Sequence, residues 1–161
     1  MMVAVACVAT GCVPASRVQD GRYVSSKGYA VAVPPAAWMQ VPDAEADVAW
    51  QREAPSARML VSGSCEDGLP RRSMDVLTRQ LIVGLRQRTV IERGETSVAG
   101  RPAGHVVVEG RADEAGEPLR VEAYVVKDAR CVYDFLYAAP ASGFETVRAE
   151  FRNVVQSFRT E

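Results

Sequence analysis

The sequence predicts an α+β fold: a single domain in which an antiparallel sheet of about six to seven strands packs against two main helices. Two observations lead to this class. Strand-like alternation of apolar and polar residues comes in consecutive runs, and only two stretches have the spacing of amphipathic helices. Because strands that follow one another without an intervening helix pair as antiparallel neighbours, the expected order is three strands, a helix, about four strands and a closing helix.

The composition fits one globular domain. The chain has 161 residues, of which 48% are hydrophobic and 24% are charged, and this length is enough to bury a stable core. The formal net charge is −1 and the charges are dispersed, so nothing in the electrostatics points to a nucleic-acid partner.

The first three strands are expected at 28–33, 48–53 and 58–62. The first alternates large and small apolar residues and stops at a Pro-Pro pair, because proline cannot donate to a sheet ladder. The other two lie on either side of Pro55, and a loop rich in glycine then ends this part of the sheet.

A change to helical spacing predicts the first helix. Ser73 stands at an N-cap position, and apolar residues then recur three or four positions apart as far as Leu85. Gly84 within this stretch costs about 1 kcal/mol relative to alanine. We therefore expect the last turn to fray or the glycine to admit a close neighbour.

Strands return at 89–98, and a turn at 100–104 leads into the next strand. There Val106 and Val108 face one way while His105 and Glu109 face the other, so one side of this strand is expected to face water.

The register of the following hairpin is constrained by charge. After a connection at 113–118, a strand begins at Leu119. Opposite charges meet if Glu109 lies opposite Arg120 or if Arg111 lies opposite Glu122. The intermediate register would place residues of like charge opposite each other. We predict one of the two favourable registers.

The last strand and the closing helix have the strongest patterns. The segment 130–138 is apolar on both faces, which predicts a central position in the sheet. Ser142 and Glu145 match a capping box, and an apolar stripe then runs from Phe144 to Phe158, as expected for an amphipathic helix.

The first dozen residues are typical of an export signal. An uncharged apolar run ends in Ala-Thr-Gly-Cys at residues 9–12, which resembles the processing site of bacterial lipoproteins, where the cysteine becomes the first residue and carries the acyl chains. We therefore expect a signal peptide at 1–12, lipidation of Cys12, a flexible tether at 13–26 and the folded domain at 27–161.

Two alternatives remain open for this segment, an ordinary secretory signal and a disordered apolar N-terminus. No Lys or Arg precedes the apolar run, Ala9 stands where lipoproteins usually have leucine, and Cys7 is a poorer second candidate for the same cut. A membrane span is excluded, because a spanning helix needs about 20 apolar residues and Arg17 and Asp20 come too early.

Cysteine parity agrees with export. Outside the leader only Cys65 and Cys131 remain, the even number that one disulfide requires. In the loop-entropy description, such a bond would stabilise the fold by about 4 kcal/mol. The alternative is two buried free thiols.

The order of elements resembles the PsbP-like superfamily, which includes the DcrB-type exported proteins and the Ran-binding Mog proteins. The shared landmarks are the strand at 29–33 that leads to Trp38, the helix after Ser73, the turn at 100–103 and the terminal segment 151–158. The resemblance covers residues 23–158 and implies an accessory or binding protein without catalysis. No functional residue carries over, since there is no family site motif to match.

His105 is the only histidine, so acid–base catalysis near neutral pH would centre on it. Its position on the outward face, beside Glu109 and Arg111, favours a solvated or cross-strand-bonded histidine instead. A cysteine nucleophile would need Cys65 or Cys131 next to that imidazole, and a disulfide would use both thiols. We therefore expect no catalytic residue and no cofactor.

The other polar clusters are expected to be solvated turns. The acidic groups at 66–67 and 113–117 lack the spacing of a calcium-binding loop, so no metal site is predicted. The arginines at 71–72, just ahead of the first helix, are candidates for holding an anion at its positive end. Trp38 and Trp50 are expected in the core or its rim rather than in a ligand cleft.

These observations lead to one hypothesis and one alternative. The hypothesis is a lipid-anchored, non-enzymatic binding or assembly accessory protein of the bacterial cell envelope, whose partners are the membrane, through the anchor, and an envelope protein. Val13 after the anchor resembles the outer-membrane pattern of lipoproteins, so we expect that membrane, facing the periplasm. The alternative is a soluble exported small-ligand carrier or hydrolase with a deep pocket around Trp38, Trp50 and Tyr133.

Overall fold

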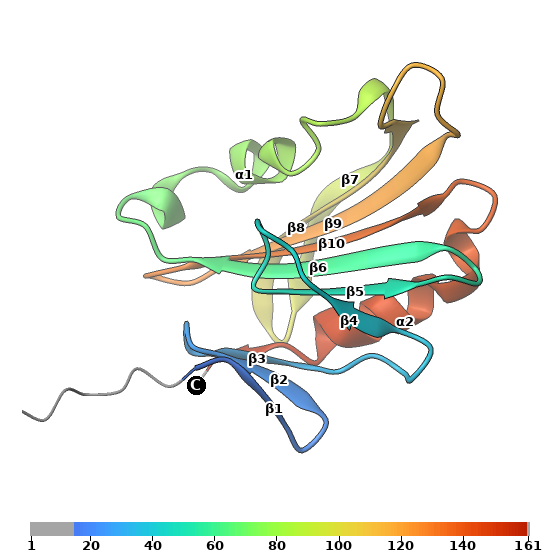
Figure 1. The fold of residues 1–161 in the computed structure, drawn as a ribbon. Coiled ribbons are helices and arrows are strands. Elements are labelled where there is room, and N and C mark those ends of the chain that lie inside the picture. Colours follow the sequence, from blue (N-terminus) through green and yellow to red (C-terminus); the bar gives the residue numbers. More distant parts are fainter. Residues whose placement is uncertain (1–14, 161) are drawn as a thin grey trace, which may run out of the picture.

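Two antiparallel sheets, rather than one, carry the fold, together with two α-helices (Figure 1). The computed structural model describes residues 15–160. The predicted α+β class is confirmed. The predicted signal peptide and Cys12 lie outside the described residues.

The larger sheet has seven strands in the order β4-β5-β6-β10-β9-β8-β7. In chain order they are β4 (Met39–Val41), β5 (Val48–Arg52), β6 (Ala57–Ser64), β7 (Arg86–Val98), β8 (Arg101–Arg111), β9 (Leu119–Lys127) and β10 (Val132–Pro140). β10 is the middle strand, as its two apolar faces predicted. Glu109 lies opposite Arg120, so one of the two favourable registers is formed, and an ion pair of 2.8 Å joins these side chains.

The smaller sheet has four strands in the order β1-β2-β3-β11. They are β1 (Arg17–Gln19), β2 (Arg22–Ser25), β3 (Tyr29–Ala32) and β11 (Arg159–Thr160).

The tether predicted at 13–26 is therefore wrong from Arg17 onward. Asp20 and Gly21 both have positive φ, 51° and 71°, which is the backbone of a tight hairpin turn that Asp-Gly favours. The hairpin buries Tyr23, which is only 3% exposed. Because this segment is mostly polar, the two short strands with a buried apolar side chain were not recognised in the sequence.

The two faces of the seven-stranded sheet are covered by different elements. Helix α2 (Phe144–Gln156) and the inner face of the smaller sheet pack on one side, and helix α1 (Met74–Gln80) packs on the other (Figure 1). The larger part of the core lies on the α2 side and is rich in aromatic side chains, including Trp50, Tyr29, Tyr133, Phe151 and Phe158.

Helix α1 is shorter than predicted. Ser73 is the N-cap, and its hydroxyl accepts a hydrogen bond from the N–H of Val76 at 3.3 Å, as expected. The helix ends at Gln80, however, and the segment to Leu85 forms turns before β7 begins. Leu85 and its apolar neighbours still pack on the sheet, so the helical spacing identified the buried residues correctly. The backbone of this segment is not helical, which agrees with the low helix propensity of Gly84.

Helix α2 begins without the predicted capping box. Its N-cap is Gly143, which makes no side-chain cap hydrogen bond. Glu145 instead lies within 3.2 Å of Arg148, one turn later. The apolar stripe was predicted correctly, because Phe144, Val147, Phe151, Val154 and Val155 are all buried. A short 3₁₀ helix, η1 (Leu69–Arg71), precedes α1.

Gly104 is where α1 comes closest to the sheet, and Gly104→Ala is expected to destabilise the fold. A Cβ there would lie 2.5 Å from Oγ1 of Thr78 and 2.7 Å from Cγ of Met74, so α1 would have to move, at about 1–3 kcal/mol. Urea denaturation measures this difference. The matched control is Gly94→Ala on the neighbouring strand, where nothing lies within 4 Å; equal effects of the two substitutions would contradict this account of the packing.

Candidate functional site

A buried carboxylate lies on the face of the sheet that was predicted to face water. Glu122 is fully buried and Val107 is 1% exposed, because α2 covers this face. His105 lies beneath the same helix with its side chain 14% exposed. The prediction that this side of β8 faces water is therefore wrong for the part that α2 covers, where the charged side chains are bonded to one another. Glu109, further along the strand, stays partly exposed.

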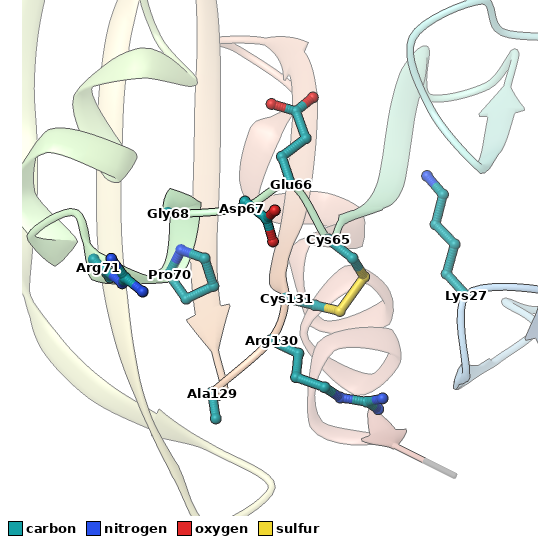
Figure 2. A pocket seen from close by; sticks show the side chains of 10 residues that line it. All are labelled: Lys27, Cys65, Glu66, Asp67, Gly68, Pro70, Arg71, Ala129, Arg130 and Cys131. Atoms are coloured by element: carbon teal, nitrogen blue, oxygen red, sulfur yellow. A yellow bond between two sulfur atoms is a disulfide. The ribbon is translucent and has the colours of Figure 1, made fainter.

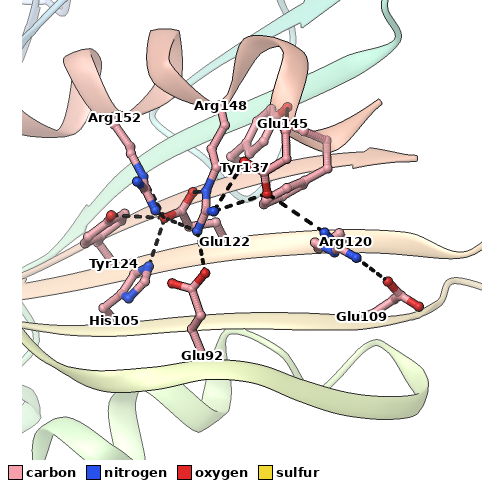
Figure 3. A network of polar contacts seen from close by, with 11 residues as sticks. Glu92, His105, Glu109, Arg120, Glu122, Tyr124, Tyr137, Glu145, Arg148 and Arg152 are labelled. Carbon is pink, nitrogen blue, oxygen red and sulfur yellow. Dashed lines mark hydrogen bonds and ion pairs between the residues drawn. The ribbon is translucent and has the colours of Figure 1, made fainter. Parts of the chain in front are cut away.

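Glu122 is the centre of this cluster, which we call the ion cluster and which consists of Glu122, His105, Tyr124, Arg148 and Arg152 (Figure 3). The Nε of Arg148 donates to Oε2 at 2.8 Å, and Nη2 of Arg152 donates to Oε1 at 2.9 Å. The hydroxyl of Tyr124 donates to Oε1 at 3.0 Å, and Nε2 of His105 lies 2.9 Å from the same oxygen.

The cluster extends toward the surface through further carboxylates. Arg148 also lies 3.2 Å from Glu92 on β7 and 3.2 Å from Glu145 on its own helix. One arginine thus bridges β7, β9 and α2.

The hydrogen bonds keep Glu122 ionised despite its burial. Burial alone would raise its pKa, but hydrogen bonds from His105, Arg148 and Arg152 outweigh that effect and lower the pKa to about 2. Burial and the negative charge of Glu122 raise the pKa of Tyr124 to about 12. At neutral pH the carboxylate is therefore charged and the phenol is protonated.

This arrangement is suited to holding α2 on the sheet and not to transferring protons. A general base needs a pKa near the working pH and a free lone pair directed at a substrate, whereas Oε1 of Glu122 accepts hydrogen bonds from several side chains at once. Nε2 of His105 lies 2.9 Å from Glu122 on the neighbouring strand, so the histidine is bonded across the strands, one of the two arrangements expected for it.

A hollow lies at the disulfide, where β6 ends and β10 begins (Figure 2). The predicted bond between Cys65 and Cys131 is formed, and it ties the end of β6 to the start of β10. The hollow has a volume of about 390 Å³ and a charged rim that includes Glu66, Asp67, Arg71 and Arg130. Because the disulfide uses both sulfur atoms, it supplies no thiol nucleophile.

Lys27 on the rim of this hollow is held by other groups. Its Nζ lies 2.6 Å from Oδ1 of Asp47 and donates to the carbonyl of Gly63 at 2.5 Å. The hydroxyl of Tyr29 donates to the other oxygen of Asp47 at 2.9 Å. These bonds tie the smaller sheet to β6 and leave Lys27 little freedom to bind a ligand.

The arginines predicted to hold an anion are separated in the structure. Arg71 lines the disulfide hollow, while the carbonyl of Arg72 accepts a hydrogen bond from Lys127 at 2.8 Å. The helix that follows them has only seven residues, so its dipole is small.

The acidic turns do not come together. Residues 66–67 line the disulfide hollow, whereas Glu114 in the β8–β9 connection pairs with Arg86 at 3.1 Å. Within residues 15–160, no group of three or more His, Cys, Asp or Glu side chains is placed to hold a metal ion.

The aromatic residues proposed for a ligand cleft are in the core. Trp38, Trp50 and Tyr133 are all buried, and Nε1 of Trp38 donates to Glu150 of α2. The interpretation of the two tryptophans as core packing is confirmed, and a deep pocket around these three side chains is excluded.

A smaller apolar hollow lies on the α1 side of the sheet. It has a volume of about 200 Å³ and is lined mainly by Leu60, Leu81, Leu85 and Leu136, which is less than ligand pockets commonly offer, about 300 Å³ or more. Asp134 lies on the same face of β10, and burial raises its pKa to about 7.

Solved structures of similar architecture come from several organisms. The solution structure of the cyanobacterial PsbP protein (CyanoP) from Synechocystis matches with a TM-score of 0.60 and 19% identity, over 98% of each chain. LpqN of Mycobacterium tuberculosis, described as involved in cell envelope biogenesis, matches with a TM-score of 0.65 and 13% identity, over 83% of each chain. The chain has the PsbP-like, Mog-type fold.

The PsbP-like fold was the expectation from the order of the elements, and it is confirmed. The Ran-binding protein Mog1p of Saccharomyces cerevisiae also matches, with a TM-score of 0.54 and 12% identity, over 83% of this chain and 90% of Mog1p. No protein-family model matches the chain, and neither does any curated protein. Between residues 15 and 160, no helix is long and apolar enough to cross a bilayer.

Proposed function

We propose that this protein is a lipid-anchored, non-enzymatic binding or assembly accessory protein of the bacterial cell envelope, acylated at Cys12 and held at the outer membrane facing the periplasm. The observation that carries the proposal is the lipoprotein-like sequence at 9–12, placed directly ahead of a PsbP-like domain whose first strand begins at Arg17.

The described domain supports a binding role more than a catalytic one. Its only histidine is fixed in the ion cluster, both cysteines outside the leader are joined to each other, and the aromatic core is filled. The Cys65–Cys131 bond fits a protein that works outside the cytoplasm. A net charge of −1 gives no electrostatic reason to expect a nucleic-acid partner.

The neighbours of the same fold support this reading of the role. LpqN is described as involved in cell envelope biogenesis and Mog1p as a Ran-binding protein, so the PsbP-like fold is used for association with other molecules. Transfer of that role to this chain is our proposal, since a shared fold does not by itself imply a shared function.

Cys12→Ala is expected to abolish acylation. Cells that express the native chain and are fed labelled palmitate should yield a labelled membrane-bound protein, because the thiol of Cys12 is the site that receives the lipid. Cys12→Ala should remove the label and release the protein from the membrane fraction. Cys7→Ala is the matched control and should retain the label. A native chain that stays unlabelled and cytosolic would refute the anchor.

A further inference from the structure

The smaller sheet begins very close to the proposed anchor. Ala15, the first described residue, comes three positions after Cys12, and an extended chain spans at most about 3.6 Å per residue, so the two Cα atoms lie within about 11 Å. The next residue is fixed to the domain, because the N–H of Ser26 donates to Oγ of Ser16 at 3.0 Å. The anchor therefore keeps this sheet, and not the rest of the domain, near the bilayer.

Three arginines lie on the outer face of this sheet. The register sets Arg17 opposite Val24, Val24 opposite Ala30, and Ala30 opposite Arg159. Directly opposed residues point to the same side, and positions two apart in a strand do so as well. The outer face consequently carries Arg17, Gln19, Arg22, Val24, Ala30, Ala32 and Arg159, whereas Tyr23, Tyr29 and Val31 point into the core.

The cations of this face have no carboxylate partner among residues 15–160. No ion pair joins Arg17, Arg22 or Arg159 to an acidic residue of the described chain, and Nε of Arg22 is buried without any hydrogen-bond partner. Arg22 and Arg159 are close enough that burial and the charge of Arg159 lower the pKa of Arg22. Like charges held together without a counter-ion attract an external anion.

We propose that the outer face of the smaller sheet is the membrane-facing surface of the protein and docks on the anionic phospholipid headgroups around its own anchor. This inference rests on the proposed lipid anchor. The length of the linking chain brings the face to the bilayer, and the exposed Arg17 and Arg159 make the contact favourable, since basic residues near an anionic surface are attracted to its headgroups. Arg22 lies between them, partly buried and bonded to the carbonyl of Ser157, and adds its charge without a direct contact. The disulfide hollow and the α1 face then remain available to other molecules.

The experiment supplies the tether in vitro, so that its result does not depend on acylation in cells. The chain from Cys12 onward, which contains every described residue, is joined through the Cys12 thiol to a maleimide lipid in vesicles. A fluorescent amino acid replaces Gln19, on the outer face, or Val83, which is 68% exposed and lies in the segment after α1 on the opposite side of the seven-stranded sheet. Lipids with a nitroxide headgroup act as the quencher.

The expected result is strong quenching at position 19 and weak quenching at position 83, in vesicles that contain phosphatidylglycerol. Arg17→Gln with Arg159→Gln should lower the ratio of docked to free protein by roughly 25-fold, about five-fold for each arginine near the surface. Arg79→Gln with Arg86→Gln removes the same charge from α1 and the start of β7, where both side chains are exposed, and should leave the quenching unchanged.

Two results would overturn the membrane-facing surface. One is equal quenching at positions 19 and 83, and the other is quenching at position 19 that is the same in purely zwitterionic vesicles. Neither result bears on acylation of Cys12, which the palmitate experiment decides separately. Success here with an unlabelled protein in cells would show that the face binds anionic lipid, but it would overturn the proposal, because no anchor would then bring the face to a bilayer.

Discussion

Glu122→Gln is expected to destabilise the protein by about 3–5 kcal/mol, the loss found when one member of a buried ion pair is removed. The carboxylate is fully buried and balances Arg148 and Arg152, whose side chains are 12% and 43% exposed. A neutral amide removes the buried counter-charge of both guanidinium groups, leaves Arg148 only the exposed carboxylates of Glu92 and Glu145, and directs its NH₂ group at donors. Equilibrium unfolding in urea measures the difference.

The control for this substitution is Glu109→Gln. Glu109 also pairs with an arginine, Arg120, on the same two strands, but its side chain is 36% exposed. Pairs that water reaches contribute about 1 kcal/mol or less. Similar losses for the two variants would mean that burial of Glu122 is not what makes its cluster important.

The same residue predicts how stability depends on pH. The folded pKa of Glu122 is lowered to about 2 from an ordinary value of 4.5, so its contribution is fully present above pH 4.5 and is lost as the pH falls toward 2. The urea midpoint of the native protein should fall across this interval. Glu122→Gln should lack this part of the decline, and an identical pH profile would contradict the assignment.

Replacing Cys65 and Cys131 together by alanine is expected to cost about 4 kcal/mol of stability. The bond joins residues 66 positions apart, and opening a loop of this length releases a large conformational entropy in the unfolded chain. Urea unfolding of the double variant measures the loss. The native protein in a reducing agent should show a similar shift, whereas the double variant should not respond. A response of the double variant to the reductant would contradict this origin of the stability.

Local patterns predicted most of the larger sheet because each strand has its own signal. Alternation placed β5, β6, β9 and β10, the two apolar faces placed β10 in the centre, and the charges of Glu109 and Arg120 set the register. The smaller sheet was not predicted as a separate sheet: β3 was expected, at 28–33, but as part of the single sheet, and its neighbours were missed. Its strands are short, and β3 has β11 as a neighbour, paired from the far end of the chain, which no local pattern reveals. The Asp20-Gly21 turn was the one signal available.

The ion cluster could not be predicted for a related reason. Alternation placed Glu122 on a face of its own strand but carried no information about which element covers that face. Arg148 and Arg152 lie four residues apart on α2, beside the apolar stripe, and this spacing could have pointed to a shared partner. Glu122 lies between Val121 and Ala123, and charged residues in such a position are ordinarily exposed to water. Its sequence position therefore did not indicate a buried partner for the two arginines.

The pairing of β11 with β3 joins the two ends of the described chain. Arg159 lies opposite Ala30, and Phe158 packs against Tyr29 and Tyr133. β3 therefore lacks one of its two neighbouring strands, and the smaller sheet lacks part of its aromatic core, until Phe158, Arg159 and Thr160 have been synthesised. Contacts between positions so distant in the chain form late in folding. The smaller sheet is therefore completed only after both the start and the end of the described chain are available to pair.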